Sequence, residues 1–177
     1  MLFNGLFGAF AGGFLLDRLG GSHGHWGASR ASFMCSAALF FCATLGIAAF
    51  FVNNIYGFFS LLTVSLFFGM SSTSPNSTIF LSVVDRSICN FSIGFQILMI
   101  HLCGDFPSPV LFGLLTDGLG GHTRALRTSV IFLWAVLLLS VVFYFFAGLS
   151  ARSRAQRLER DAQKEIVQPI IVVYNQE

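Results

Sequence analysis

The sequence predicts an all-α polytopic membrane protein, and three observations carry this prediction. Of its 177 residues, 55% are hydrophobic and 10% are charged, whereas a soluble domain carries about a quarter charged residues. The apolar residues fall in long runs, of the kind that cross a bilayer as helices of about 20 residues. The basic residues gather in alternate loops, as they do in membrane proteins with a defined orientation. Together these features predict five membrane spans, the first one partial.

The first predicted span, residues 1–16, is apolar and glycine-rich but shorter than a full crossing. A signal peptide would begin with basic residues, and no charged residue precedes Asp17. We therefore expect residues 1–16 to be the last part of a helix that starts upstream. A hydrophilic loop follows, and residues 33–52 form the second span before a turn at Asn53 and Asn54.

The third predicted span, residues 55–84, is interrupted by the polar segment SSTSPNST at 71–78. Pro75 has no N–H group, so it leaves the carbonyl of Ser71 without a helical partner. One interpretation is Ser/Thr packing between helices. We favour a broken helix that lines a cavity. Its expected lining residues are Ser71, Thr73, Asn76 and Thr78.

The fourth predicted span, residues 91–117, carries ionisable residues and two prolines near its middle. Such residues are costly at membrane depth and usually face a protein interior or a water-filled cavity. At helical spacing, His101, Asp105 and Ser108 share one face. Pro107 and Pro109 break the helical hydrogen bonding beside them. We favour a bent, polar-lined helix along a solute path. The alternative is a kinked packing helix in which His101 bonds a neighbouring helix.

The fifth predicted span, residues 128–149, is uniformly apolar, and residues 150–177 are expected to form a largely disordered tail. The Lys and Arg residues define the orientation of these spans. Eight of them fall on one side and two on the other, which predicts a cytosolic C-terminus. The larger group is Arg18, Arg30, Arg86, Arg152, Arg154, Arg157, Arg160 and Lys164, and the smaller is Arg124 and Arg127.

Enzyme signatures are missing from the sequence, which has no GxSxG, no HExxH and no P-loop motif. An intramembrane hydrolase would need a nucleophile elbow, whereas Ser108 and His101 share one predicted helix. The four cysteines lack paired spacing and read as small apolar residues. We expect no enzyme activity, no cofactor, no metal and no nucleic-acid partner.

Two segments resemble known transporters. Residues 13–20, GFLLDRLG, are similar to the G-x-L-x-D-R-x-G loop motif of the major facilitator superfamily. Residues 75–117 resemble the spinster family, whose eleventh helix carries H-x-x-G-D-x-P-S-P followed by G-x-x-x-D. The matching residues are Pro75, Asn76, Val84, Arg86, Ser87, the run from His101 to Pro109, Gly113 and Asp117.

The resemblance implies that the chain is the C-terminal part of a major facilitator bundle, from helix eight (partial) to helix twelve. It implies a carrier of lysophospholipids or sphingoid phosphates, driven by a proton gradient, in an endolysosomal or plasma membrane. Membrane lipids surround such a carrier. Because helices one to seven are absent, the chain is expected to be a fragment or half that needs a missing N-terminal half or a homologous partner.

The resemblance also assigns expected roles to residues. His101 and Asp105 would couple protons or hold a gate. Gln96 would join the cavity residues of the third span, which is expected to line the central path. The prolines Pro75, Pro107 and Pro109 would break helices. The cytosolic gate loop would contain Gly13, Asp17, Arg18 and Gly20.

Two alternatives remain open at the level of sequence. One is another major facilitator carrier, for sugars or organic anions. A sugar carrier would place more Gln, Asn and Trp in the cavity spans than this chain has. The other is a non-transporting membrane protein that pairs with a full-length relative.

Overall fold

The computed structural model describes residues 2–21, 26–105, 107–118 and 123–174, and within them the secondary structure is entirely helical. The predicted all-α polytopic fold is thereby confirmed. The helices in chain order are α1 (Leu2–Arg18), α2 (Gly27–Ala49), α3 (Ile55–Ser71), α4 (Thr73–Val83), η1 (Arg86–Ile88), α5 (Cys89–Met99), η2 (Ile100–Asp105), α6 (Pro107–Gly118) and α7 (Thr123–Tyr174). Of these, η1 is a 3-10 helix and η2 is a π-helix.

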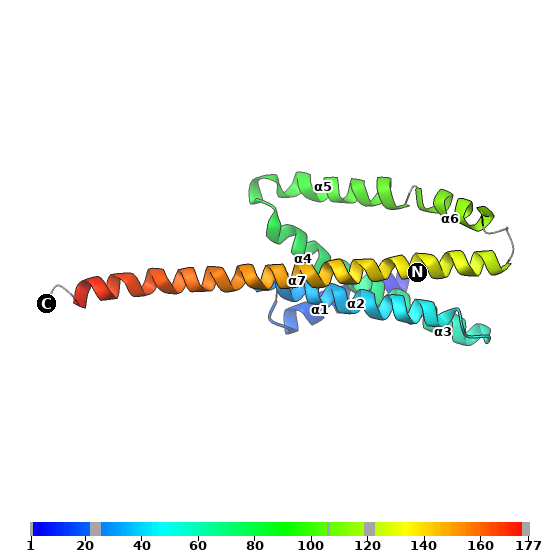
Figure 1. The fold of residues 1–177 in the computed structure, drawn as a ribbon, viewed down its shortest axis with the longest axis horizontal. Helices are drawn as coiled ribbons and strands as arrows, with labels where there is room; N and C mark the ends of the chain where they lie inside the picture. The colour runs from blue at the N-terminus through cyan, green and yellow to red at the C-terminus, as the bar shows by residue number, and fades with distance from the viewer. Residues whose placement is uncertain (1, 22–25, 106, 119–122, 175–177) are drawn as a thin grey trace.

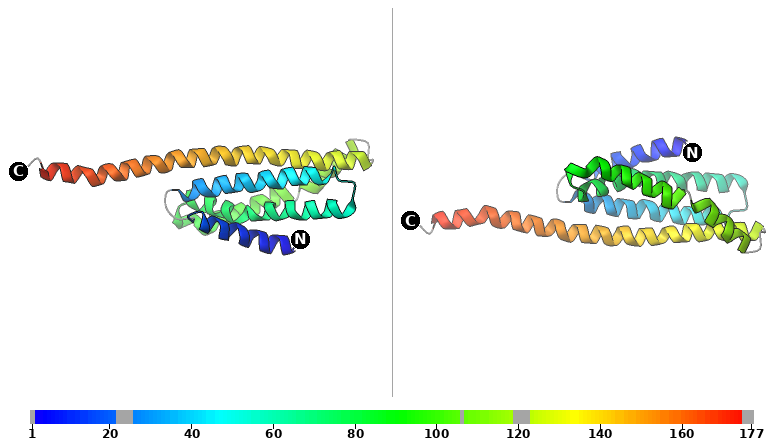
Figure 2. Two further views of the ribbon diagram at one scale, coloured as in Figure 1. Left: turned by 90° about the horizontal axis from the view of Figure 1, so that it is seen from below. Right: turned by 90° about the horizontal axis from the view of Figure 1, so that it is seen from above.

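Helix α2 lies at the centre of the bundle (Figures 1 and 2). It packs along α7 on one side and along α3 and α4 on the other, while α1 packs on α3 and α4. Its buried residues are small, with Met34 the one large exception. In lipid, helices associate through close packing, and small residues permit that approach. At Gly46, for example, a Cβ atom would collide with the ring of Trp134 on α7.

The turn predicted at Asn53 and Asn54 separates α2 from α3. The side chain of Asn54 accepts a hydrogen bond from the backbone N–H of Tyr56, at 3.0 Å. This satisfies one of the N–H groups that the first turn of a helix leaves without a partner. Asparagine is one of the preferred residues at this capping position, so the sequence itself starts α3 here.

The segment α5–η2–α6 stands away from the rest of the bundle (Figure 1). Helix α5 contacts mainly its chain neighbours η1 and η2, and α6 packs against α7. None of the described residues of α5 is buried. In α6, the hydroxyl of Thr116 donates to the buried Ser129 hydroxyl of α7, at 3.3 Å.

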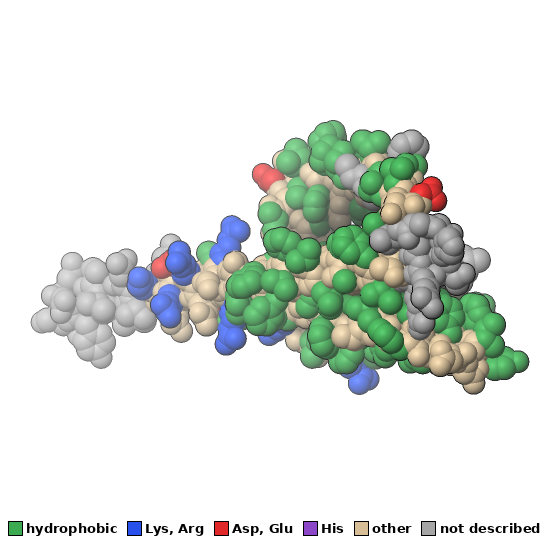
Figure 3. All heavy atoms as spheres, turned by 45° about the vertical axis from the view of Figure 1, so that its right-hand side comes forward, with side chains coloured by type: hydrophobic (Ala, Val, Ile, Leu, Met, Phe, Trp, Pro, Cys, Tyr) green, Lys and Arg blue, Asp and Glu red, His purple; other side chains and the backbone are tan. Residues whose placement is uncertain are grey.

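Helix α7 continues well beyond its apolar part. It runs for 52 residues, or roughly 78 Å at 1.5 Å per residue. The structure differs here from the disordered tail expected for residues 150–177, because helix continues to Tyr174. Residues 151–164 are rich in Ala, Arg and Gln, which are strong helix formers. Figure 3 shows basic side chains clustered on this extension and apolar side chains over the bundle.

Among the described residues, three stretches are long and apolar enough to cross a membrane, namely Gly27–Ala49, Ile55–Val83 and Thr128–Lys164. Cys89–Leu102 is a shorter apolar helix. Helix α2 begins at Gly27, whereas the sequence placed the start of its span at residue 33. The reason is that the first residues of α2, GASRAS, are small and polar. A hydropathy pattern therefore does not assign them to an apolar span, although they are helical.

Candidate functional site

The polar break in the third predicted span is the first candidate. Helix α3 ends at Ser71 and α4 begins at Thr73, so Ser72 interrupts the stretch that is long enough to span a membrane. Pro75 is the third residue of α4 and its side chain is fully buried. Proline is tolerated in the first turn of a helix, where N–H groups have no intrahelical partner. The sequence thus breaks the helix at Ser72 and restarts it at once.

Two glycines of α1, Gly8 and Gly12, pack against the last turn of α3, next to the break. A Cβ atom at Gly12 would collide with the carbonyl oxygen of Ser71. One turn earlier, a Cβ at Gly8 would lie 2.9 Å from the carbonyl oxygen of Phe67 and 2.8 Å from Cβ of Met70. The carbonyl that Pro75 deprives of its helical partner therefore faces the backbone of α1. Glycine is required at this contact because only a hydrogen fits between the two backbones.

Helix α2 supports the same break from another side. The carbonyl oxygen of Ser72 accepts a hydrogen bond from the N–H of Asn76 at 3.0 Å and from the thiol of Cys35 at 3.5 Å. Cys35 is fully buried and belongs to α2. At membrane depth, irregular backbone is tolerated only where protein or water satisfies it. Helices α1 and α2 together provide that environment.

The hydroxyl groups near the break are bonded locally. Five of them donate to a backbone carbonyl three or four residues earlier in the chain, which is a known way to bend a helix. The donors are Ser71, Ser72, Thr73, Ser77 and Thr78, at distances of 2.7 to 3.3 Å. Each hydroxyl oxygen keeps capacity to accept a further bond. The segment can therefore offer acceptors to a solute without losing its own structure.

The residues predicted to line a cavity do not share one surface. Ser71 is buried, Thr78 is half-buried and Thr73 is exposed. The amide oxygen of Asn76 accepts a 2.7 Å hydrogen bond from the hydroxyl of Tyr144, which joins α4 to α7. Thr73 and Ser77 are both exposed and lie one turn apart on α4. The open face of the break thus carries Thr73 and Ser77, and its packed face carries Ser71 and Asn76.

The π-helix η2 is the second candidate. It contains His101, whose side chain is exposed, while the side chain of Asp105 lies outside the described part of the structure. Pro107 is the first residue of α6, a position where its missing N–H costs nothing. Wide π-type turns inside helices are frequent at functional sites. In the described residues, neither α5 nor η2 has extensive contact with α3 or α4, so His101 and half-buried Gln96 are not packed against the break.

The loop after α1 is the third candidate. Gly20 has a φ of 106°, a conformation that favours glycine, and its carbonyl accepts a 2.8 Å hydrogen bond from the guanidinium of Arg30. The guanidinium of Arg18 lies over the ring of Phe14, at 4.8 Å from its centre. The carboxyl group of Asp17 is exposed. At the other end of this loop, the indole N–H of Trp26 donates to the carboxylate of Glu159 on α7.

Sequence reasoning missed several residues that hold these sites together. Gly8 and Gly12 form a small-xxx-small pattern, a known signal for close helix packing. Tyr144 is a hydroxyl-bearing residue in a span that is otherwise almost wholly apolar. Cys35, Arg30 and the pair Trp26–Glu159 gave no signal, because their roles depend on which helices become neighbours. Gly13, assigned to the gate loop, lies within α1 near the hydroxyl of Ser74 on α4.

In the described residues, a helical bundle with three membrane-length stretches, one of them interrupted at Ser72, has the features of a polytopic membrane protein. Comparison with known proteins specifies this class further. The chain is similar to spinster transporters, over 84% of its length at 27% identity for the probable sphingolipid transporter spinster homolog 3 of Arabidopsis thaliana. Spinster homologs 1 and 2 of the same plant match 79% and 75% of the chain, at 27% and 28% identity.

The Organic Anion Transporter Polypeptide (OATP) family matches residues 52–119, which reach from α3 to the end of α6. No solved structure matches the chain significantly. These similarities support a spinster-like sequence of the major facilitator type. The chain spans 27 to 28% of the length of the curated relatives that it matches.

Proposed function

We propose that this chain supplies the C-terminal helices of a spinster-like carrier for amphipathic lipids of the lysophospholipid or sphingoid-phosphate class. The proposal is supported by the similarity to proteins named as sphingolipid transporters. The observation that carries it is the break at Ser72 within Ile55–Val83. Broken helices at membrane depth are where many carriers hold their solute.

The chemistry of the open face suits an amphipathic solute. Thr73 and Ser77 are exposed and their hydroxyl oxygens can still accept hydrogen bonds. Apolar side chains such as Met70 and Leu81 are exposed on the same stretch. A site with few polar groups on an apolar wall fits a solute with a small head and a long chain.

His101 and Asp105 are the proposed proton-coupling or gating pair. Both belong to η2, whose hydrogen bonds link residues five apart, so residues four apart lie within one π-turn. Histidine is the side chain that most readily changes charge near neutral pH. Gln96, on the preceding helix, would extend the polar wall toward this pair.

The carrier needs further helices, from a missing N-terminal half or a homologous partner. Carriers of this type place the solute site between two repeats. The face of α5 that would meet them is exposed, with Phe91 at 75% and Phe95 at 51% of full exposure. We propose that the carrier is located in an endolysosomal or plasma membrane and that its C-terminus lies on the cytosolic side. The last residues of α1, Asp17 and Arg18, and Gly20 in the loop that follows would then brace the cytosolic gate.

Coexpression tests this proposal directly. The chain would be reconstituted in liposomes alone, and with a separate polypeptide containing helices one to seven of the Arabidopsis spinster homolog 3. We expect saturable, gradient-driven uptake of a fluorescent sphingoid phosphate only when both polypeptides are present. Uptake by the chain alone would contradict the need for a partner. A stable complex that moves no solute would favour a non-transporting binding protein instead.

A matched pair of variants links uptake to the break. Thr73→Val combined with Ser77→Val removes two hydroxyls from the open face of α4. We expect this double variant to reduce uptake severalfold. Thr44→Val is the control, because the Thr44 hydroxyl is bonded in the same local way but belongs to α2. Equal losses in both proteins would point to general destabilisation rather than to solute contact.

An organic-anion carrier is the second candidate, because the OATP family matches the segment that contains the break and the π-helix. The two proposals differ in whether the solute must carry a long apolar chain. Uptake of a soluble sulfonated dye, undiminished by excess lysolipid, would favour the organic-anion carrier. Uptake of the lipid with no uptake of the dye would favour the first proposal.

A further inference from the structure

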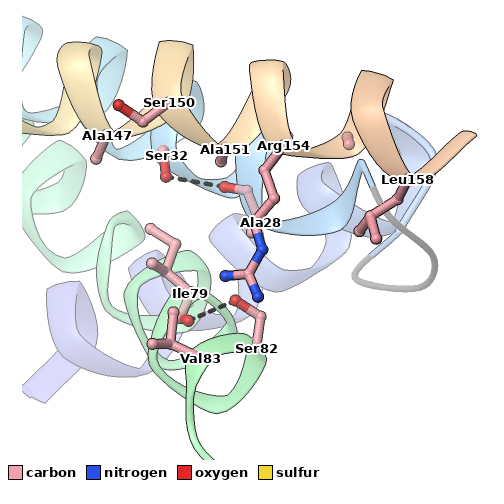
Figure 4. Close-up of a pocket in the computed structure, with 11 residues that line it drawn as sticks. Ala28, Ser32, Ile79, Ser82, Val83, Ala147, Ser150, Ala151, Arg154 and Leu158 are labelled. Atoms are coloured by element: carbon pink, nitrogen blue, oxygen red, sulfur yellow. Dashed lines mark hydrogen bonds between the residues drawn. The ribbon is translucent and has the colours of Figure 1, made fainter. Parts of the chain in front are cut away.

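A cavity at the basic end of the bundle is separate from the break and from η2. It has a volume of about 470 Å³ and lies between the start of α2, the end of α4 and the middle of α7. Figure 4 shows Arg154 extending from α7 across this cavity toward the end of α4. None of the residues that we assign to the solute path lines it.

Two chemically different parts make up the cavity wall. One part is apolar and includes Ile79, Val83 and Leu158, over a floor of small alanines such as Ala151 and Ala155. The other part is polar and consists of three serine hydroxyls and one guanidinium. These polar residues are Ser32, Ser82, Ser150 and Arg154.

Arg154 is the only charged group that lines the cavity among the described residues. Among the described residues, no hydrogen bond or ion pair involves its guanidinium. The nearby carboxylates have other partners, since Glu159 accepts a hydrogen bond from Trp26 and Asp161 pairs with Lys164. It points toward the last turn of α4, where helix carbonyls attract a cation. An anion could therefore bind Arg154 without displacing a carboxylate.

The cavity also has the right position along the bundle for a lipid head. Its lining on α7 runs from Ala147, inside the predicted apolar span, to Leu158 in the basic extension. This distance is roughly 16 Å at 1.5 Å per residue. The lining thus changes from apolar to basic along α7. A membrane lipid changes in the same direction, from acyl chains in the hydrocarbon to a phosphate at the charged boundary.

We propose that this cavity binds a phosphate-bearing membrane lipid, with the phosphate on Arg154 and the start of an acyl chain against Ile79, Val83 and Leu158. Guanidinium groups suit phosphate because their N–H donors match its oxygens. The hydroxyls of Ser32 and Ser82 donate to the carbonyls of Ala28 and Ile79, and their oxygens can still accept a bond from the rest of the head. The site lies apart from the proposed solute path and does not depend on the transport proposal.

Binding of a fluorescent short-chain phosphatidic acid to the purified 177-residue chain, in a non-ionic detergent, tests the proposal. Unlabelled phosphatidic acid should displace the probe, whereas diacylglycerol and inorganic phosphate should displace it poorly. Displacement by inorganic phosphate at the concentrations where the lipid acts would show a free-anion site and overturn the lipid assignment. Equal displacement by diacylglycerol would overturn the role of the phosphate.

Variants locate the binding in the cavity. Arg154→Ala should weaken binding about tenfold or more, as expected for loss of a charge-assisted hydrogen bond, and Arg154→Lys should restore part of it. Ala151→Leu should weaken binding by filling the floor, with no change in charge. The controls are Arg160→Ala and Gln156→Leu, on exposed positions of α7 that do not line the cavity.

The controls decide between a built site and diffuse attraction to basic residues. If Arg160→Ala weakens binding as much as Arg154→Ala, the cavity is not the site. Unchanged binding by Ala151→Leu also overturns it. Far-UV circular dichroism and gel filtration establish that each variant is folded. If Arg154→Ala fails that check, the comparison of Ala151→Leu with Gln156→Leu gives the result.

Discussion

At the scale of single residues, Gly12 is the most demanding position in the bundle, because it faces the Ser71 carbonyl that Pro75 leaves without a helical partner. We expect Gly12→Ala to destabilise the folded chain by about 1 to 3 kcal/mol, the usual cost of overpacking. The measurement is unfolding in mixed micelles by a denaturing detergent. Gly5→Ala is the control, since a Cβ there has nothing within 4 Å. Equal destabilisation by the two variants would remove the role assigned to the contact.

Tyr144 supplies the hydrogen bond that ties α7 to the packed face of α4. Replacing it by Phe removes the hydroxyl and leaves the ring. We expect a loss of about 0.6 kcal/mol, and at most about 1.7 kcal/mol, as for other hydrogen bonds between membrane helices. A double-mutant cycle with Asn76→Ala measures the coupling, and Tyr56→Phe, at an exposed position, is the control. Additive effects in the cycle would mean that the two side chains do not interact in the membrane.

His101 and Asp105 can be tested in the complex with helices one to seven. A coupling pair predicts that His101→Ala and Asp105→Asn each reduce transport and flatten its pH dependence while the amount of folded carrier stays near normal. A packing pair predicts lost expression instead, because removal of one side chain would leave the other without its polar partner in the assembled carrier. Transport rates against pH, normalised to folded protein, distinguish the two. Normal rates with an unchanged pH profile in both variants would end the coupling role.

At the scale of elements, the break between α3 and α4 could be predicted from Pro75 and the polar residues around it. The start of α2 at Gly27 could not be, because small polar residues in a loop and in a helix look alike in a hydropathy pattern. The helical extension of α7 was also missed. There, the charged composition suggested disorder, whereas the propensity of Ala, Arg and Gln for helix, continued from a packed span, favours helix.

The loop between α1 and α2 depends on Arg30, whose guanidinium holds the carbonyl of Gly20. We expect Arg30→Ala to speed amide hydrogen exchange in residues 19–21 about tenfold, because a charge-assisted hydrogen bond is lost and the loop opens more often. Mass spectrometry of exchanged peptides gives this measurement. Arg152→Ala, at an exposed position of α7, is the control and should leave exchange in the loop unchanged.

At the scale of the whole molecule, the bias of Lys and Arg predicts the orientation of every helix. A reporter fused after Glu177 should lie in the cytosol, and one inserted at Gly121 should lie on the opposite side. The side chains of Arg124 and Arg127 lie outside the described part of the structure, so this prediction rests on the sequence. Accessibility of both reporters in intact cells tests it. A C-terminal reporter on the lumenal or outer side would reverse the orientation and the assignment of the gate loop.

Much of the candidate site was predictable as a set of residues but not as an arrangement. Proline and ionisable residues in apolar spans pointed to the break and to η2. Which faces are packed depended on partners far along the chain, such as Gly12, Cys35 and Tyr144. The sequence pattern also gave Ser71 and Thr73 the same role, although one is buried and the other exposed. Their difference comes from the approach of α1 and α2, which no local pattern encodes.

Because α7 is one continuous helix, a small tilt at one point displaces its distant residues by a larger distance. Tyr144 anchors it to α4 inside the bundle, and Glu159 holds the loop through Trp26 further along. These two residues lie 15 positions apart, or roughly 22 Å along the axis. A tilt of about 5° at the anchor would move the far point by about 2 Å, which is enough to break a hydrogen bond. Rocking of α7 about this anchor would therefore either break the hydrogen bond between Trp26 and Glu159 or move Trp26, which precedes α2, together with α7.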